Sequence, residues 1–202
     1  MKEAEAKLIF IVSEFSKIDI SMKEEEFFDN ILGVGKYLVP TAEAGSITLK
    51  QGEYFRYMAS FGYKKDILQD IAFKMKEHYI MKGKTGSVIR DIVTHDEALP
   101  KSIKDALFKA GTNKIKQTLV APIIVNDEYL GGIFLDSFKE SKIFLKEDLR
   151  VATALSNLSS VFVESKLAYN KLFALSNFNT ASVSLLHKYC QNIVRNSLQF
   201  VS

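Results

Sequence analysis

Residues 119–136 read LVAPIIVNDEYLGGIFLD and contain two apolar runs separated by polar residues at 126–128. Asparagine and aspartate tolerate a positive φ and close tight turns, so the segment predicts a β-hairpin whose strands are apolar on both faces. Pro122 and the pair Gly131 and Gly132 would weaken interior strands. We expect Pro122 at a bulge or an unpaired position, and the glycines where backbone or ligand approaches closely.

The remaining sequence alternates between helical and strand-like patterns. Apolar residues three and four positions apart predict helices, and β-branched or aromatic runs bounded by glycine predict strands. Ser21 and Glu24 have capping-box spacing, Ser102 and Asp105 are candidate caps of a later helix, and Gly111 would end that helix. The expected helices are 5–17, 21–38, 66–83, 102–110 and 146–175, and the expected strands lie in 46–62, in 83–93 and in the hairpin.

This order of elements mixes adjacent hairpins with separated helices, and it predicts an α+β fold with a mostly antiparallel sheet. At 202 residues the chain is long enough for one domain and too short for two ordinary ones. We expect residues 1–175 to form the domain. Residues 176–202 begin with a polar break and are expected to form a helical tail without a domain of its own.

The composition argues against several classes of protein. Apolar residues make up 47% and charged residues 25% of the chain, and the net charge of +3 is spread among interleaved acids, so neither nucleic acid nor a membrane is expected as a partner. Cys190 is the only cysteine, and His78, His95 and His187 are far apart, which argues against a metal site. The N-terminal apolar run is too short for a signal peptide or a transmembrane span, so a cytoplasmic location is expected.

The segment 146–175 contains neither proline nor glycine, and its apolar positions alternate at spacings of four and three. Such a helix would be about 45 Å long, which is longer than a small domain needs for its own core. Part of it is therefore expected to pack on something else. The seam consists of Val151, Leu155, Leu158, Phe162, Ser165, Tyr169 and Leu172.

Several segments together resemble the GAF domain, a cytoplasmic small-molecule sensor module related in shape to PAS domains. The resemblance covers about residues 8–172 and depends on the order and spacing of segments that are weak signals one by one. They are AGSITL (44–49), ASFGY (59–63), GKTGSVIRD (83–91), LVAPIIVNDEYLGGIFLDS (119–137) and FLKEDLRVATALSN (144–157).

The resemblance implies a sheet of five or six strands, with the first and last helices packed on one face and a pocket enclosed on the other. In the family those helices commonly pair with a second subunit, which would make the seam a homodimer interface. The pocket would be bordered by Phe61, Arg90, Asp91, Thr118 and Asp136, of which Arg90 and Asp91 are the polar groups able to orient a ligand.

The ligand-specific signatures of the family are incomplete in this sequence. The run 83–85, Gly-Lys-Thr, matches the end of a P-loop, but His78 stands where that loop needs a glycine. Cyclic nucleotide-binding members have an Asn-Lys pair where residues 136–137 are Asp-Ser, and Leu149 replaces a glutamate of the same signature. Chromophore attachment and sulfoxide reduction in this fold need cysteines inside the domain, where this sequence has none.

The other candidate residues do not indicate an enzymatic activity. His187 is followed by a lysine, whereas a kinase phosphoacceptor helix has an acidic residue there. His95 lies beside Asp96 and Glu97 without an identifiable nucleophile, so a solvated loop is the favoured interpretation. The aromatic residues of 54–63 either build the core or line a pocket.

We therefore expect a non-catalytic, dimeric sensor that binds an unidentified small molecule and transmits through its terminal helices. A separate output protein is a candidate partner, since residues 176–202 are too few to fold into an output domain. The alternative is a GAF-like scaffold without a ligand, whose helices form the dimer or bind another signalling protein. The sequence names no cofactor.

Overall fold

The computed structural model describes residues 2–16, 19–74, 87–89 and 99–176. The helices are α1 (Lys2–Phe15), α2 (Glu24–Leu38), α3 (Lys65–Gln69), α4 (Lys101–Ala110) and α5 (Lys146–Ser176), with a short 3₁₀ turn at Thr112–Lys114. The strands are β1 (Ala44–Gln51), β2 (Tyr54–Phe61), β3 (Ala72–Phe73), β4 (Ser87–Ile89), β5 (Gln117–Val125) and β6 (Glu128–Ser137).

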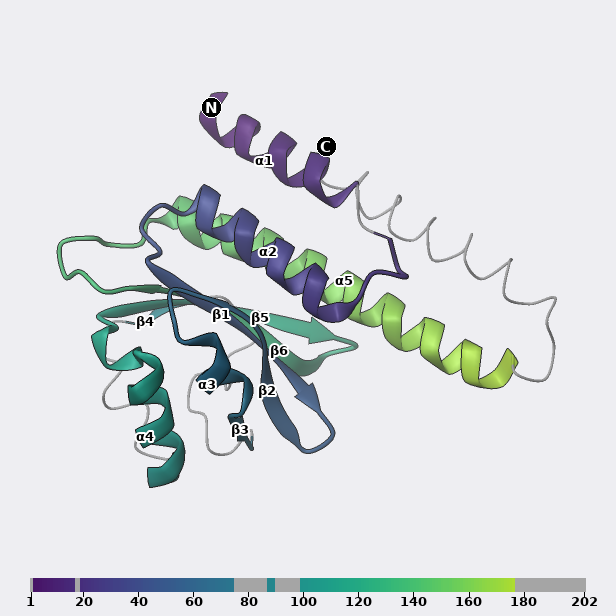
Figure 1. Cartoon of the computed structure of the whole chain (residues 1–202). Helices are drawn as coiled ribbons and strands as arrows, with labels where there is room; N and C mark the ends of the chain where they lie inside the picture. Colours follow the sequence, from purple (N-terminus) through teal and green to yellow (C-terminus); the bar gives the residue numbers. More distant parts are fainter. Residues whose placement is uncertain (1, 17–18, 75–86, 90–98, 177–202) are drawn as a thin grey trace.

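The strands form one six-stranded sheet in the order β3-β2-β1-β6-β5-β4, and every neighbouring pair is antiparallel. Figure 1 shows three layers, with α1, α2 and α5 on one side of the sheet and α3 and α4 on the other. We call the side covered by α2 and α5 the first face and the opposite side the second face. The predicted α+β fold with an antiparallel sheet of five or six strands is confirmed.

The β5–β6 hairpin forms as its sequence predicts. Asn126 and Asp127 have φ values of 51° and 62°, the left-handed geometry that a tight two-residue turn requires. The β1–β2 hairpin turns at Gly52, whose φ is 63°. Local turn chemistry therefore places four of the six strands.

The first-face core joins the sheet to α2 and α5. The predicted stripe of α2 is buried in full and consists of Phe27, Ile31, Val34 and Leu38. Phe27 stacks on Phe162 of α5, with ring centroids 3.7 Å apart and planes inclined by 6°. Burying side chains of this size stabilises the fold by about 1.5–3 kcal/mol each. The two long helices and the sheet therefore form one packed unit.

A smaller apolar cluster covers part of the second face. It joins the sheet to α3 and α4, and its buried members include Phe55, Leu68, Phe73, Leu107 and Phe134. Phe55 and Phe73 lie in register on β2 and β3, with ring centroids 6.1 Å apart. The second face is thus apolar toward β3, and it carries polar side chains elsewhere.

Pro122 lies where β5 loses its outer neighbour. Within the described residues, β4 pairs with β5 only as far as Val120, so Pro122 has no strand on that side, although it lies opposite Gly132 on the other. The Pro122 carbonyl accepts a hydrogen bond from the Ser156 hydroxyl of α5. The Ser160 hydroxyl accepts one from the Ile124 N–H at 3.1 Å. Pro122 therefore occupies a half-unpaired position, as expected, and the adjacent bulge lies one residue further on.

The third helix is shorter than predicted. Helical spacing predicted a helix over residues 66–83, but α3 ends at Gln69 and the chain then extends into β3. Ile71 and Phe73 are buried in the second-face cluster, and β3 pairs with β2. Strand pairing and burial therefore outweigh the local helical pattern. The remainder of the predicted helix lies outside the described residues.

Two predicted N-terminal caps are wrong, while the predicted C-terminal cap is confirmed. The helix α2 begins at Glu24, and the Ser21 N–H instead donates to the Asp19 carboxylate at 2.8 Å. The helix α4 begins at Lys101 after Pro100, without a side-chain cap, so Ser102 and Asp105 lie inside it. Gly111 ends α4 with a φ of 109°, which favours glycine.

The two glycines of β6 meet different neighbours. A Cβ atom at Gly131 would lie 2.1 Å from the Thr48 carbonyl oxygen of β1, so the predicted close backbone approach is confirmed. A Cβ atom at Gly132 would lie 2.8 Å from the Tyr129 hydroxyl. The first contact involves a fixed backbone atom, and the second involves the end of a side chain.

We predict opposite effects of alanine at two glycines. Gly131→Ala should lower the free energy of unfolding by about 3 kcal/mol or more, because β1 and β6 must separate to admit the methyl group. Gly33→Ala should raise it by about 0.5–1 kcal/mol, because Gly33 is an exposed residue inside α2 with no atom within 4 Å of the added carbon. Urea denaturation measures both values, and equal effects would contradict the described β1–β6 contact.

Candidate functional site

A buried carboxylate lies at the end of β6 on the second face. Thr118 of β5 is in register with Asp136, and its hydroxyl donates a hydrogen bond to Asp136 Oδ1 at 2.6 Å. The Tyr63 hydroxyl donates to Asp136 Oδ2 at 2.6 Å. Asp136 is only 3% exposed. Two neutral hydroxyl groups thus hold both oxygens of a carboxylate inside the protein.

The environment of Asp136 disfavours its charge. Burial raises the pKa of Asp136 from its ordinary value of 3.8 to about 6, although the hydrogen bonds from Thr118 and Tyr63 act in the opposite direction. Burial also raises the pKa of the Tyr63 phenol, and the nearby Asp136 carboxylate adds to this effect. Tyr63 therefore stays a neutral donor, and Asp136 changes charge close to neutral pH.

Tyr63 connects this carboxylate to the helices of the second face. It lies between β2 and α3, and the next residue, Lys64, donates its N–H to the Ala110 carbonyl at the end of α4 at 3.1 Å. The Tyr63 ring also contacts Phe138, with centroids 6.1 Å apart. The Asp136–Tyr63 hydrogen bond therefore links the sheet to the layer formed by α3 and α4.

The five residues predicted to border a pocket do not all gather. Thr118 and Asp136 meet on the second face, as described above. Phe61 lies on the first face, where its ring is 2.6 Å from the position of a Cβ atom at Gly45 and below the Lys36 ammonium of α2, 5.5 Å from the ring centroid. Arg90 and Asp91 lie outside the described residues. The structure thus joins one pair of the set and separates Phe61 from it.

A bulge explains the position of Phe61. Ile47 is opposite Ala59 and the next residue, Thr48, is opposite Tyr57, so Met58 is an extra residue in β2. The extra residue exchanges the faces on which the following side chains lie. Phe61 is consequently on the first face, opposite to Tyr57.

Sequence reasoning missed three polar residues of the second face. Tyr63 appeared only as one of several aromatic residues, although a buried aspartate needs hydrogen-bond donors and this tyrosine supplies one. Thr48 and Tyr129 carry buried hydroxyl groups near Gly132. The threonine between Ile47 and Leu49 in β1 is the signal that was available.

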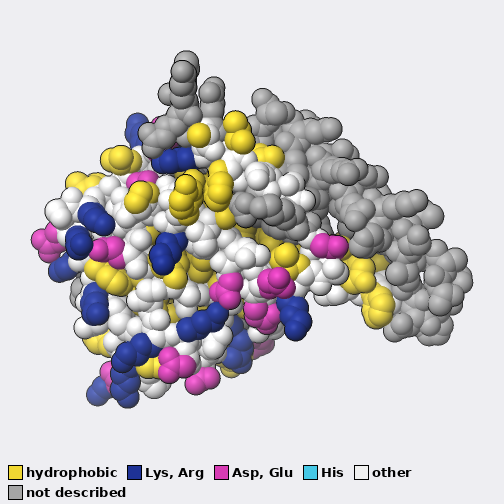
Figure 2. All heavy atoms as spheres, turned by 45° about the horizontal axis from the view of Figure 1, so that its top comes forward, with side chains coloured by type: hydrophobic (Ala, Val, Ile, Leu, Met, Phe, Trp, Pro, Cys, Tyr) yellow, Lys and Arg dark blue, Asp and Glu magenta, His cyan; other side chains and the backbone are white. Residues whose placement is uncertain are grey.

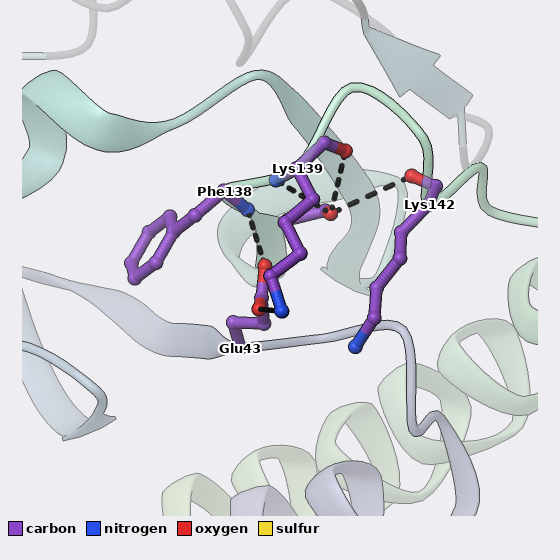
Figure 3. A network of polar contacts seen from close by, with 5 residues as sticks. Glu43, Phe138, Lys139 and Lys142 are labelled. Atoms are coloured by element: carbon purple, nitrogen blue, oxygen red, sulfur yellow. Dashed lines mark hydrogen bonds and ion pairs between the residues drawn. The ribbon is translucent and has the colours of Figure 1, made fainter.

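The segment between β6 and α5 is held to the start of β1. The Glu43 N–H donates to the Asp136 carbonyl at 2.8 Å, and the Glu43 carboxylate accepts the Phe138 N–H at 2.9 Å. Its other oxygen pairs with the Lys139 ammonium at 3.2 Å, as Figure 3 shows. The hydrogen bond from Phe138 is the main reason that the pKa of Glu43 lies below its ordinary value, and Lys139 contributes to this shift. Glu43 therefore stays ionised and anchors this connection.

The predicted seam of α5 serves mainly the chain's own core. Val151, Leu155 and Phe162 are buried in the first-face core, and Leu158 packs against it. Tyr169 and Leu172 are only partly buried, and the C-terminal part of α5 extends beyond the sheet in Figure 1. These observations do not test the predicted homodimer, but they leave only the end of the seam accessible to a partner.

Among the described residues, no three His, Cys, Asp or Glu side chains gather in a way that would hold a metal ion. No described helix is both long enough and apolar enough to cross a membrane. Several residues singled out in the sequence lie outside the part of the chain that the structure describes. They are His78, His95, His187, Cys190 and nearly all of the predicted tail, residues 177–202.

Comparisons with known proteins find similarity of structure. No protein-family model matches the sequence, and no curated protein matches it. The GAF domain of a phosphoenolpyruvate-protein phosphotransferase from Coxiella burnetii superposes with a TM-score of 0.68 at 16% identity, over 84% of this chain and 98% of that one. The nlh2 GAF domain of A. aeolicus in an inactive state gives 0.56 at 24% identity, over 80% and 98%.

Residues 122 to 287 of a methyl-accepting chemotaxis protein give a TM-score of 0.60 at 16% identity, over 76% of this chain and 94% of that fragment. The chain therefore has the fold of GAF domains, which confirms the fold that the sequence resemblance implied.

We predict a pH-dependent contribution of Asp136 to stability. Because its folded-state pKa is raised from 3.8 to about 6, the folded state binds the proton more tightly than the unfolded state. The stability due to this proton is present below pH 4 and is lost as the pH rises through 6, by about 3 kcal/mol in total. Asp136→Asn should lack this loss.

Urea denaturation between pH 4 and pH 7.5 measures the effect as the difference between wild type and Asp136→Asn. The exposed residue Asp105 of α4 supplies a matched control, Asp105→Asn, for which the difference should stay flat. A wild-type advantage that grows with pH would show that the ionised carboxylate has a favourable partner, contrary to the prediction.

Proposed function

We propose that this chain is a sensory module that binds a small molecule at the second face and signals through α5. The observation that carries this proposal is the buried Asp136, which has a raised pKa and only neutral hydrogen-bond partners among the described residues. A buried charge of this kind is costly, and such groups are more frequent at functional sites than elsewhere. The likeness to a chemotaxis protein and to GAF domains supports a signalling role by analogy.

The path from Asp136 to α5 is short. The Asp136 carbonyl is hydrogen-bonded to Glu43, which also holds Phe138 and Lys139, the first residues after β6. At the other end of this connection, the Leu145 N–H donates to the Asp148 carboxylate in the first turn of α5 at 2.8 Å. A ligand that favours one position of Asp136 would thereby favour one position of α5, which is a population shift between two conformations.

We expect the purified protein to respond to small molecules taken from its own cell extract. A thermal-shift screen of extract fractions should find a raised Tm, and mass spectrometry of the responding fraction should identify the compound. Asp136→Asn should reduce the shift, because the ligand would lose its contact with the carboxylate. Hydrogen exchange of residues 138–150 should slow on binding in the wild type.

The control is Asp105→Asn, which should respond as the wild type does. A protein that is consistently empty and unresponsive would contradict the sensor proposal. A ligand that binds without any change at 138–150 would contradict the proposed route through α5.

We further propose that the C-terminal end of α5 mediates homodimerisation. Leu167 is 46% exposed and Phe173 is 51% exposed, and the ring of Phe173 stacks near Tyr169 with centroids 6.1 Å apart. In Figure 2, hydrophobic side chains lie on the part of the surface where α5 extends beyond the sheet. Large apolar side chains on a projecting helix are typical of a surface that a partner covers.

Light scattering at micromolar concentration should give twice the chain mass of 22.8 kDa. The double variant Leu167→Glu, Phe173→Glu should be monomeric, because burying two carboxylates in the interface is costly. The matched control is Ile143→Glu, Leu145→Glu, which changes two residues that are 48% and 64% exposed at the other end of α5. A monomeric wild type, or equal behaviour of the two double variants, would contradict this proposal.

A ligand-free scaffold is the second candidate. It is favoured by the filling of part of the second face by Phe55, Phe73 and Phe134, and by the occupation of both Asp136 oxygens. In that case ionisation of the buried Asp136 would still lower the stability of the fold as the pH rises, but no extract fraction would raise the Tm. The ligand screen therefore discriminates between the two functions.

A further inference from the structure

The centre of the second face contains a second group of residues, separate from Asp136. Thr48 of β1 lies between Tyr57 of β2 and Gly132 of β6, with which it is in register. Gly132 and Asp136 are four positions apart on β6, which corresponds to about 13 Å along a strand. The group around Thr48 is thus a distinct part of the same face.

Two bulges direct tyrosine side chains to this place. Met58 is the extra residue of β2, and Leu130 is the extra residue of β6, because Ile123 is opposite Gly131 while Ile124 is opposite Tyr129. Bulges re-aim the side chains next to them. The Tyr129 hydroxyl consequently lies over Gly132, only 2.8 Å from where a Cβ atom would be.

Aromatic rings lie close to Tyr129 and Gly132. The Tyr129 ring centroid is 5.9 Å from that of Phe55, and the Phe134 ring lies 3.2 Å from the position of a Cβ atom at Gly132. Gly132 contributes no side chain, and the groups nearest to the position of its missing Cβ atom are the Tyr129 hydroxyl and the Phe134 ring. The surroundings suit a flat, apolar molecule better than a charged one.

The Thr48 and Tyr129 hydroxyl groups are buried without a hydrogen-bond partner among the described residues. Thr48 is only 1% exposed. Buried polar side-chain atoms are rarely left unpaired in proteins, and an unpaired one often marks a place where a water or a ligand belongs. Each hydroxyl group can donate as well as accept a hydrogen bond, and a single acceptor atom between the two would satisfy both donors.

We propose that Thr48 and Tyr129 form a subsite for a small, uncharged aromatic molecule whose carbonyl oxygen accepts hydrogen bonds from both hydroxyl groups. This inference rests on the proposed ligand binding at the second face and specifies the chemistry of the ligand there. The aromatic rings around Gly132 contact the flat body of the molecule, and Tyr129 swings aside to admit it. Asp136, about 13 Å further along the face, takes no part in this contact and would meet a different part of the ligand.

The first arm of the test uses the protein without ligand. Thr48→Val and Tyr129→Phe remove the hydroxyl groups and keep the shape, so each should raise the Tm by about 2–6 °C, because an unpaired buried group disappears. Thr153→Val and Tyr37→Phe are the matched controls, since Thr153 is exposed on α5 and Tyr37 is 70% exposed. A lower Tm for either test variant would show that its hydroxyl is satisfied, for example by a structural water, and would overturn the proposal.

The second arm uses benzamide, a neutral aromatic amide, as the probe. Saturation-transfer NMR titration should show binding to the wild type, weaker by about tenfold or more for benzoate, which is charged, and for toluene, which lacks an acceptor. Thr48→Val and Tyr129→Phe should each weaken benzamide binding by about fivefold or more. Absence of benzamide binding, or equal affinity in wild type and both variants, would overturn the subsite.

Different results would contradict the subsite and the proposed function. If benzamide binding is lost in Asp136→Asn but kept in Thr48→Val and Tyr129→Phe, the ligand lies at the Asp136 end, so the subsite is wrong and the sensor proposal stands. If no cell-extract fraction shifts the Tm while benzamide still binds at Thr48, the subsite is real and the sensor proposal fails.

Discussion

The pairing of β1 with β6 is the contact on which the rest of the structure depends. The sheet consists of two three-stranded halves, β3-β2-β1 and β6-β5-β4, and this pair alone joins them within the sheet. Gly131 permits the close approach to the Thr48 carbonyl. The register also decides which residues share a face, since a slip of one residue would move Asp136 from the second face to the first. The β1–β6 pairing thus positions both the apolar core and the candidate site.

Features that depend on neighbouring residues were predictable from the sequence. The turn at Asn126 and Asp127, the buried stripe of α2 and the length of α5 all follow from local chemistry or from a regular spacing over many residues. The short α3 was not predictable, because residues 71–73 follow a helical spacing and are drawn into the sheet only by burial and by pairing with β2. Local pattern is informative where no distant contact competes with it.

The candidate site was predictable only in part, for a specific physical reason. The turn alone would place Thr118 opposite Leu135, and the extra residue Leu130 shifts the register so that Thr118 meets Asp136. Their meeting was therefore implied by the family resemblance and not by the turn. Phe61 and Tyr129 depend on single extra residues in β2 and β6. Nothing in a strand of apolar residues marks where such a bulge occurs, and each bulge exchanges the faces of the side chains beyond it.

Two serines attach the middle of α5 to the edge of β5, and in the signalling that we propose the helix would turn about this attachment. Ser156 and Ser160 attach the middle of the helix to Pro122 and Ile124, so a small displacement at the N-terminal end of α5 turns the helix about this attachment. The 16 residues beyond Ser160 extend for about 24 Å. A rotation of about 5° would move the far end by about 2 Å, comparable to the helix shifts seen at regulated subunit interfaces. The 14 residues before Ser160 form an arm of about 21 Å, so the same rotation needs a shift of about 2 Å at the N-terminal end of α5. If α5 carries the signal as proposed, the serine pair would pass this movement to the far end at nearly its full size.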